Sequence, residues 1–204
     1  MDAGRALTFG GLAADLLAAP PLLGGTRLVC VDGPAGSGKT TFAGRLVAAL
    51  GDAAELVHMD DLYAGWTLTG AVARLEAGVL RPLAAGRPGA YSRFDWTAGR
   101  FDDVPVPVRP APVLVVEGCG SSPRRLDPWT TLRVWVEAPA PLRLERGLAR
   151  DGTAMAPHWH RWLATEAAEF AREDTRRRAH LRVDGAPVTP LTSGRFAPLD
   201  DTCR

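Results

Sequence analysis

One eight-residue segment joins three glycines to the only lysine of the chain. Residues 33–40 read Gly-Pro-Ala-Gly-Ser-Gly-Lys-Thr, which fits the pattern G-x-x-x-x-G-K-[ST]. In such a loop, backbone N–H groups surround a β-phosphate, the lysine reaches the β and γ oxygens, and the following hydroxyl binds Mg²⁺. We therefore expect this phosphate loop to hold ATP and Mg²⁺. The residues expected to bind the nucleotide are Gly33, Pro34, Ala35, Gly36, Ser37, Gly38, Lys39, Thr40 and Thr41.

The residue types that the chain lacks sharpen this expectation. The sequence has 24 basic residues, of which only Lys39 is a lysine, and it contains no Asn, Gln or Ile. Where every other cation is arginine, the single lysine occupies the position at which a compact ammonium group suits a phosphate. This coincidence argues against an accidental motif.

The same absences disfavour two classes of nucleotide hydrolase. GTPases read guanine with an Asn/Thr-Lys-x-Asp motif, which a chain without a second lysine cannot contain. Transporter-type and recombinase-type ATPases position water with a glutamine, or with a glutamate that follows the Walker B aspartate. The apolar run at 113–116 ends instead in Glu117-Gly118, with one acid and no glutamine. Transfer of a phosphoryl group to a bound hydroxyl is therefore favoured over hydrolysis.

The phosphate loop lies between a predicted strand and a predicted helix, which is the context that its chemistry needs. Apolar runs predict strands over residues 27–31, 55–58, 113–116, 132–136 and 181–183. Helical spacing of apolar residues predicts helices over 6–19, 40–50, 68–85, 141–150 and 158–178. This alternation predicts an α/β fold with a doubly wound, mostly parallel sheet of about five strands and helices on both faces.

A single domain is expected over residues 1–204, because 204 residues suffice for one sizeable core and no linker-like tract divides them. Within it, residues 67–112 are predicted to be an excursion on the substrate side of the site, since their second half is rich in Gly, Pro and aromatic residues. Residues from about 150 to 158 are predicted to form a lid. The tail after Gly185 holds three prolines and is expected to be irregular.

Composition also limits the partners and the compartment. The net charge of +1 gives no support to a nucleic-acid partner. The three cysteines have no metal-ligand spacing, and two of them lie in apolar runs, as core thiols of a cytoplasmic protein would. The apolar stretch 12–23 is interrupted by Asp15 and by prolines and glycines, so neither a signal peptide nor a membrane span is expected. The sequence is also compatible with a homo-oligomer.

Two groups of charged residues could act on a phosphoryl group. Asp60 and Asp61 follow the predicted strand 55–58, and open α/β sheets place their chemistry at that end of a strand. Neighbours in an extended segment point to opposite sides, so only one carboxylate can face the γ-phosphate. The arginines at 143, 146 and 150 share one face of a predicted helix and could converge. The alternative interpretations are a helix cap for the aspartates and a solvated face for the arginines.

From about residue 28 to 185, the sequence resembles the uridine kinase and phosphoribulokinase branch of the P-loop kinases. Four segments carry the resemblance. They are Val-Asp-Gly-Pro-Ala-Gly-Ser-Gly-Lys-Thr-Thr at 31–41, Met-Asp-Asp-Leu-Tyr at 59–63, Val-Val-Glu-Gly at 115–118, and Arg-x-x-Arg-x-x-x-Arg-Asp at 143–151.

The resemblance implies roles for individual residues. It implies that Asp60 is the base that accepts the proton of the substrate hydroxyl and lies near Mg²⁺, with Leu62 in place of an aromatic residue. Glu117 would contact metal-bound water or substrate hydroxyls. Arg146 and Arg150 would belong to a lid that closes over the phosphates. The implied catalytic residues are Lys39, Asp60, Arg146 and Arg150, and the implied metal-binding residues are Thr40, Asp60 and Glu117.

The phosphoryl acceptor is less well defined. The resemblance implies a nucleoside, and the alternatives are another hydroxyl compound, such as a sugar, a vitamin precursor or an antibiotic, or a P-loop module that binds or slowly hydrolyses ATP and acts through a partner. With no Asn or Gln, side-chain amides cannot read a base. Aromatic residues of the excursion could stack on a planar substrate or simply pack in the loop. The residues expected to contact the acceptor are Asp61, Tyr63, Tyr91, Arg93, Trp96 and Glu117.

Overall fold

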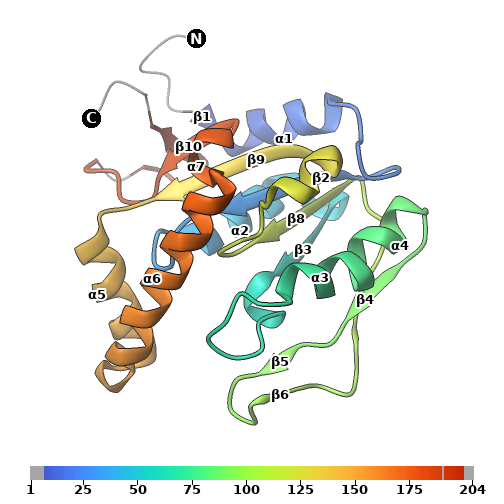
Figure 1. Ribbon diagram of the computed structural model, residues 1–204. Helices are drawn as coiled ribbons and strands as arrows, with labels where there is room; N and C mark the ends of the chain where they lie inside the picture. Colours follow the sequence, from blue (N-terminus) through green and yellow to red (C-terminus); the bar gives the residue numbers. More distant parts are fainter. Residues whose placement is uncertain (1–6, 190, 200–204) are drawn as a thin grey trace.

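The phosphate loop joins β2 (Arg27–Asp32) to α2 (Lys39–Leu50) in the computed structural model, which describes residues 7–189 and 191–199 (Figure 1). The central sheet has seven strands in the order β1-β11-β10-β9-β2-β8-β3. Its five consecutive strands from β10 to β3 run parallel, which confirms the predicted mostly parallel α/β sheet. Besides β2, they are β3 (Ala54–His58), β8 (Val113–Glu117), β9 (Thr130–Glu137) and β10 (Leu181–Asp184).

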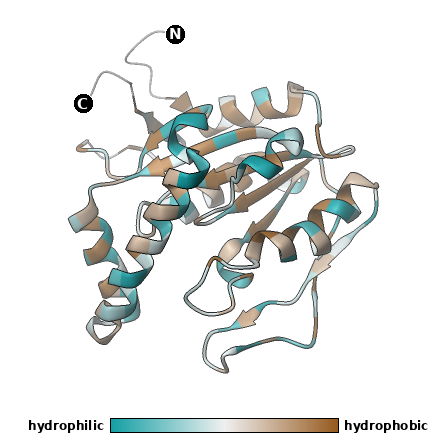
Figure 2. Ribbon diagram, viewed as in Figure 1, coloured by the Kyte–Doolittle hydropathy of each residue, from teal (hydrophilic) through white to brown (hydrophobic). Residues whose placement is uncertain are grey.

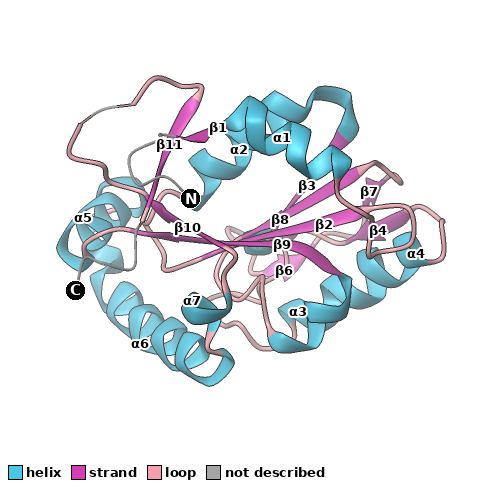
Figure 3. Ribbon diagram, turned by 90° about the horizontal axis from the view of Figure 1, so that it is seen from above, coloured by secondary structure: helices cyan, strands magenta, loops and turns pink. Residues whose placement is uncertain are grey.

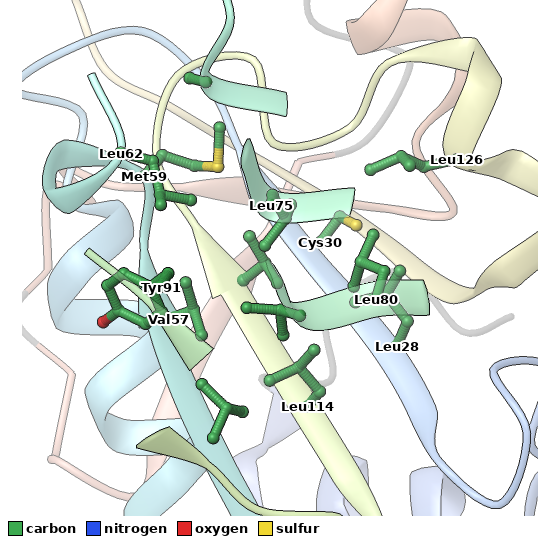
Figure 4. Close-up of a cluster of buried hydrophobic side chains, with 14 of the residues drawn as sticks. Leu28, Cys30, Val57, Met59, Leu62, Leu75, Leu80, Tyr91, Leu114 and Leu126 are labelled. Carbon is green, nitrogen blue, oxygen red and sulfur yellow. The ribbon is translucent and has the colours of Figure 1, made fainter. Parts of the chain in front are cut away.

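The middle strands of the sheet are buried on both faces. Leu28 and Cys30 of β2 face one layer of the core, whereas Val29 and Val31 face the other. Figure 4 shows the first layer, in which these strand residues lie beside side chains such as Leu75 from the covering helices. Strands that are covered on both faces need continuous apolar runs, which is why short runs without alternation predicted them correctly. Figure 2 shows the same contrast between hydrophobic strands and helices of mixed character.

Helices cover both faces of the sheet, as predicted (Figure 3). On one face lie α1 (Phe9–Ala18) and α2, which pack against each other and against the strands. The opposite face carries α3 (Ala71–Leu75), a π-helical segment (Glu76–Leu80) and α4 (Arg81–Ala84), which together form the helix predicted over 68–85.

The C-terminal helices differ slightly from the prediction. α5 (Ala140–Asp151) and α6 (Ala156–Glu173) are packed together, and α6 adds Trp162 to the core on the same face as α3. The helix predicted over 158–178 is interrupted at Asp174, which has a φ of 54° and separates α6 from α7 (Thr175–Arg178).

The predicted excursion contains small sheets of its own. Two separate antiparallel pairs, β4 with β7 and β5 with β6, follow α4. The strands are β4 (Gly89–Tyr91), β5 (Phe94–Asp95), β6 (Arg100–Phe101) and β7 (Val106–Val108). Short 3-10 turns occur at Gly51–Ala53, Met59–Asp61, Arg124–Trp129 and Thr153–Met155.

The tail after Gly185 is not irregular throughout, and that expectation was wrong. Residues Arg195–Pro198 form β11, which runs antiparallel to β10 and also pairs with β1 (Leu7–Thr8). Phe196 of β11 packs its ring 5.0 Å from that of Phe9. A proline at the end of a strand is tolerated where a partner does not need its N–H, so the prolines did not prevent a strand.

Candidate active site

The phosphate loop has the backbone conformation that its glycines allow. Gly36 has a φ of 77°, and a Cβ atom there would lie 2.5 Å from the carbonyl oxygen of Arg143. Gly33 has a φ of 140°, and its Cβ would lie 2.1 Å from the carbonyl oxygen of Val136. Only glycine tolerates both the left-handed backbone and such close approach. The loop therefore lies pressed against β9 and α5 at the carboxyl end of β2.

Lys39 lies at the first position of α2 and is almost fully buried. Its ammonium nitrogen donates to the carbonyl oxygen of Pro34 at 3.0 Å and contacts the sulfur of Cys119 at 3.5 Å. Burial opposes the charge, but nearby anionic groups, among them Glu117 and Glu166, outweigh burial and raise the pKa of Lys39 above its usual value. The lysine is therefore charged and held by the loop, as phosphate binding requires.

Two buried carboxylates hold the phosphate loop against its neighbours. Asp32 accepts hydrogen bonds from the N–H groups of Gly33, Gly120 and Ser122 at 2.7 to 2.9 Å, and burial raises its pKa to about 6. It thus links the start of the phosphate loop to the turn after β8. Sequence reasoning did not identify this role, although Asp32 directly precedes the loop.

The second carboxylate, Glu166, comes from α6. It accepts from the N–H of Ala35 at 2.8 Å and pairs with Arg143 of α5 at 3.1 Å. Both side chains are largely buried, and Arg143 also reaches the carbonyl oxygen of Ala35 at 3.4 Å. Arg143 is therefore used to attach α5 and α6 to the phosphate loop. No sequence motif pointed to Glu166, because the contact spans 131 residues.

The two neighbouring aspartates point to different surroundings. Asp60 lines a cavity beside the phosphate loop, and no hydrogen bond or ion pair reaches its carboxylate from the described residues. Asp61 does not line the cavity; it accepts a hydrogen bond from the Tyr91 hydroxyl at 2.9 Å and pairs with Arg93 at 3.3 Å. Of the two aspartates, Asp60 is thus the one whose carboxylate has no hydrogen bond or ion pair among the described residues.

The environment of Asp60 disfavours its charge. Burial within the protein and the nearby carboxylate of Glu117 raise the pKa of Asp60, whereas the positive charges of Lys39 and Arg150 lower it. Asp60 is solvent-accessible, so the effect of desolvation is smaller than for a fully covered carboxylate. A carboxylate whose pKa is raised is a stronger base once it is ionised.

Glu117 ends β8 and is buried next to the loop. It accepts from the Thr40 hydroxyl at 3.2 Å and lies 2.6 Å from Nδ1 of His58, whose pKa it raises. The hydroxyl and carboxylate oxygens of Thr40, Glu117 and Asp60 fit a hard cation such as Mg²⁺, which needs few protein ligands when phosphates and water supply the rest. In the described part of the chain, no cluster of three or more His, Cys, Asp or Glu side chains forms a ready-made metal site.

His58 was not predicted, although the parallel register places it beside Glu117 at the ends of β3 and β8. Because strands that pair in parallel end at the same edge, this neighbour could have been found once the strand order was known.

Arg146 and Arg150 line the cavity, whereas Arg143 does not. Arg146 donates to the carbonyl oxygens of Gly36 at 3.1 Å and Gly185 at 3.2 Å. Arg150 pairs with Asp151 at 2.7 Å and lies 5.9 Å from the ring of Trp159. Of the three arginines that were predicted to converge, Arg143 therefore holds α5 and α6 to the phosphate loop, whereas Arg146 and Arg150 face the cavity.

The cavity measures about 1140 Å³ and opens at the carboxyl ends of the parallel strands. One side is lined by residues from β10, β11 and the tail, including Phe196, and the other by residues after β3 and from α6. The phosphate loop follows β2, which lies between these strands in the sheet. Of the expected acceptor contacts, Tyr63, Trp96 and Glu117 line the cavity. Asp61, Tyr91 and Arg93 do not; they hold the excursion to the end of β3.

Four of the six tryptophans also line this cavity. Trp96 was expected there, but Trp66, Trp159 and Trp162 were not. Trp66 is central, with ring centroids 5.8 to 6.2 Å from those of the other three. The spacing of Trp159 and Trp162 places them on one face of α6, which is the pattern that could have identified them.

The order of the strands and the phosphate loop between β2 and α2 give an α/β fold that solved structures share. Two examples are similar over most of this chain. A protein from Bacillus stearothermophilus, provisionally assigned as a uridine kinase, has a TM-score of 0.62 at 20% identity over 85% of this chain and 96% of its own. A protein from Silicibacter sp., provisionally assigned as a fructose transport system kinase, has a TM-score of 0.60 at 24% identity over 81% and 95%. At these identities the likeness concerns the fold alone.

No protein-family model matches the chain. Among the described residues, none of the helices combines the length and the apolar character needed to cross a membrane.

Proposed function

We propose that the chain is an ATP-dependent phosphotransferase that moves the γ-phosphoryl group of ATP to a hydroxyl group of a small molecule. One observation carries the proposal: Lys39 and Thr40 share a single cavity with the carboxylate of Asp60, which has no partner among the described residues, and with Arg146 and Arg150 of α5. A phosphate site alone would serve binding or hydrolysis. A free carboxylate in the same cavity as the phosphate loop, with room for a second molecule, supports transfer to an alcohol.

In the proposed reaction, the acceptor oxygen attacks the γ-phosphorus while Asp60 takes its proton. The new O–P bond forms as the bond from the γ-phosphorus to the β,γ-bridging oxygen breaks, and ADP carries the electron pair away. Lys39, Arg146 and Arg150 stabilise the charge that moves onto the phosphate oxygens. When bound at Thr40, Glu117 and Asp60, Mg²⁺ would neutralise part of the triphosphate charge.

The resemblance favours a nucleoside as acceptor, and a sugar, a vitamin precursor or an antibiotic is the alternative within the kinases. The alternative outside the enzymes is a module that hydrolyses ATP slowly and acts through a partner. Release of ADP from Mg·ATP, measured with a panel of these alcohols, separates the two. A kinase releases ADP rapidly only with a suitable alcohol, whereas a module shows one slow rate throughout. A rate at the water background for every compound would contradict the kinase proposal.

The arginines of α5 provide a second test. We expect Arg146→Ala and Arg150→Ala each to lower kcat by roughly tenfold to a hundredfold with a smaller change in KM for ATP, because they stabilise charge that shifts during transfer. Steady-state kinetics of ADP release would measure this.

Arg143→Ala is the matched control, since Arg143 comes from the same helix but binds Glu166. It should mainly lower the melting temperature, because it leaves a buried carboxylate unpaired. If both cavity arginines change only KM for ATP, they serve ground-state binding, and the proposed role in the transition state is wrong.

A further inference from the structure

The part of the cavity beside Asp60, where the proposed acceptor would bind, is the acceptor end, and it is lined by the indole rings of four tryptophans. Trp66 from the loop after β3 and Trp96 from the excursion provide its accessible surface, and Trp96 is 45% exposed. Trp159 and Trp162 of α6 are buried and form the layer beneath. Three segments that are distant in sequence therefore bring their aromatic side chains together next to Asp60.

Most polar groups at this end are already paired with each other. The indole N–H of Trp96 donates to the carbonyl oxygen of Asp60 at 3.2 Å, and that of Trp159 donates to Asp151 at 3.0 Å. Asp151 is also paired with Arg150. Among the described residues, the carboxylate of Asp60 is the charged group at this end that has no hydrogen bond or ion pair, and the chain contains no side-chain amide.

Indole rings together with one free carboxylate favour some kinds of alcohol over others as the acceptor. A sugar placed against these rings would turn several hydroxyl groups toward them and toward paired groups, and each buried hydroxyl without a partner costs free energy. An aromatic ring with one hydroxymethyl group needs a hydrogen-bond partner mainly at that group, and its ring gains edge-to-face or stacking contacts with indoles. Asp60 is the partner for the hydroxyl.

We propose that the acceptor is an alcohol that carries a planar aromatic or heteroaromatic ring and few other hydroxyl groups, with the ring held by Trp66 and Trp96. This inference rests on the proposed phosphotransfer to a hydroxyl, and it names the chemical class that the site prefers. A nucleoside shares the ring, but its ribose hydroxyls and the polar edge of its base make it a poorer match than a hydroxymethylpyridine, whose ring nitrogen is a single further acceptor.

The test compares 3-hydroxymethylpyridine with uridine, ribose and glucose as acceptors for Mg·ATP. The expected result is a kcat/KM for 3-hydroxymethylpyridine at least about tenfold above those of the other three, since one unpaired buried polar group suffices for such a ratio. An equal or higher kcat/KM for uridine, ribose or glucose would overturn the inference.

Substitutions of the two accessible tryptophans test whether the ring of the acceptor binds at these residues. Trp66→Leu and Trp96→Ala should each raise KM for 3-hydroxymethylpyridine by roughly tenfold to a hundredfold through lost apolar contact, and leave KM for ATP nearly unchanged. Trp129→Phe is the matched control, because Trp129 is partly buried but does not line the cavity. Unchanged KM values in both cavity variants, with the proteins folded by circular dichroism, would overturn the assignment of the ring site.

Binding separates a failure of this inference from a failure of the proposed function. If no alcohol is phosphorylated, the proposed function fails, but titration of tryptophan fluorescence still reports whether the ring binds. We expect 3-hydroxymethylpyridine to change the emission saturably, with an affinity that is weaker in Trp96→Ala and unaffected in Trp129→Phe. An absence of saturable change in the unaltered protein would contradict the ring site itself.

Discussion

Replacing Lys39 by alanine should abolish phosphoryl transfer and leave a folded protein. Lys39 is the charged group that the phosphate loop encloses, and its ammonium is held in place by the carbonyl oxygen of Pro34. Without it, the charge on the β and γ oxygens lacks its nearest cation, and we expect a loss of roughly a thousandfold in turnover, at the upper end for one preorganised electrostatic group. ADP release in the presence of an accepted alcohol is the measurement, and circular dichroism establishes that the variant is folded.

The companion variant Lys39→Arg tests why the chain keeps one lysine. It preserves the charge, but a planar guanidinium is larger and needs a different set of acceptors than the enclosed site around Pro34 and Cys119 offers. Arginine should therefore restore little activity, although every other basic residue of the chain is an arginine. Turnover of a folded Lys39→Ala protein at the original rate would remove the functional assignment of the loop.

The second large effect is expected at Asp60. The substitution Asp60→Asn keeps the shape of the side chain but removes its ability to accept a proton, so turnover should fall by roughly a hundredfold or more. Nucleotide affinity should change little, because the phosphate loop makes most of the contacts with the phosphates. Rapid-mixing measurements of a single turnover, together with equilibrium binding of ATP, distinguish the chemical step from binding.

Asp61→Asn is the matched control for this prediction. Asp61 is next in sequence but is bound by Tyr91 and Arg93, so its replacement should loosen the excursion and weaken acceptor binding more than it slows the chemical step. If Asp61→Asn lowers the single-turnover rate more than Asp60→Asn does, Asp61 is the base and the assignment from cavity geometry is wrong.

The parts of the fold that could be predicted are those with a local cause. Continuous apolar runs located the parallel strands, and the glycines located the loop between β2 and α2. The strand β11 escaped prediction because one of its partners, β1, is distant in sequence, and the prolines of the tail suggest irregular structure when seen alone. The interruption of the last helix at Asp174 also lacks a glycine or proline that would have marked it.

At the candidate site, the residues that belong to short motifs could be predicted from the sequence. The residues that come from distant segments of the chain could not. Lys39, Asp60 and Arg146 lie around the cavity because short motifs fix them at strand ends or on one helix face. Glu166 and Trp66 gain their roles only through packing between distant segments. The pairing of Tyr91 and Arg93 with Asp61 likewise depends on how the excursion folds back, which periodicity cannot reveal.

The pairing of β1 with β11 at one edge of the sheet also bears on the order in which the protein folds. Contacts between segments that are distant in sequence carry a greater loop-closure entropy cost than local contacts and tend to form after them. The rings of Phe9, Phe42 and Phe196 have centroids 5.0 to 5.3 Å apart. Phe196 can join the other two rings only when β11 has formed. On the ribosome, the parallel strands therefore have the chance to collapse early, while the wall of the cavity that contains Phe196 is completed only after residues 195–198 have been synthesised. The nascent chain would lack this wall of the cavity until that point.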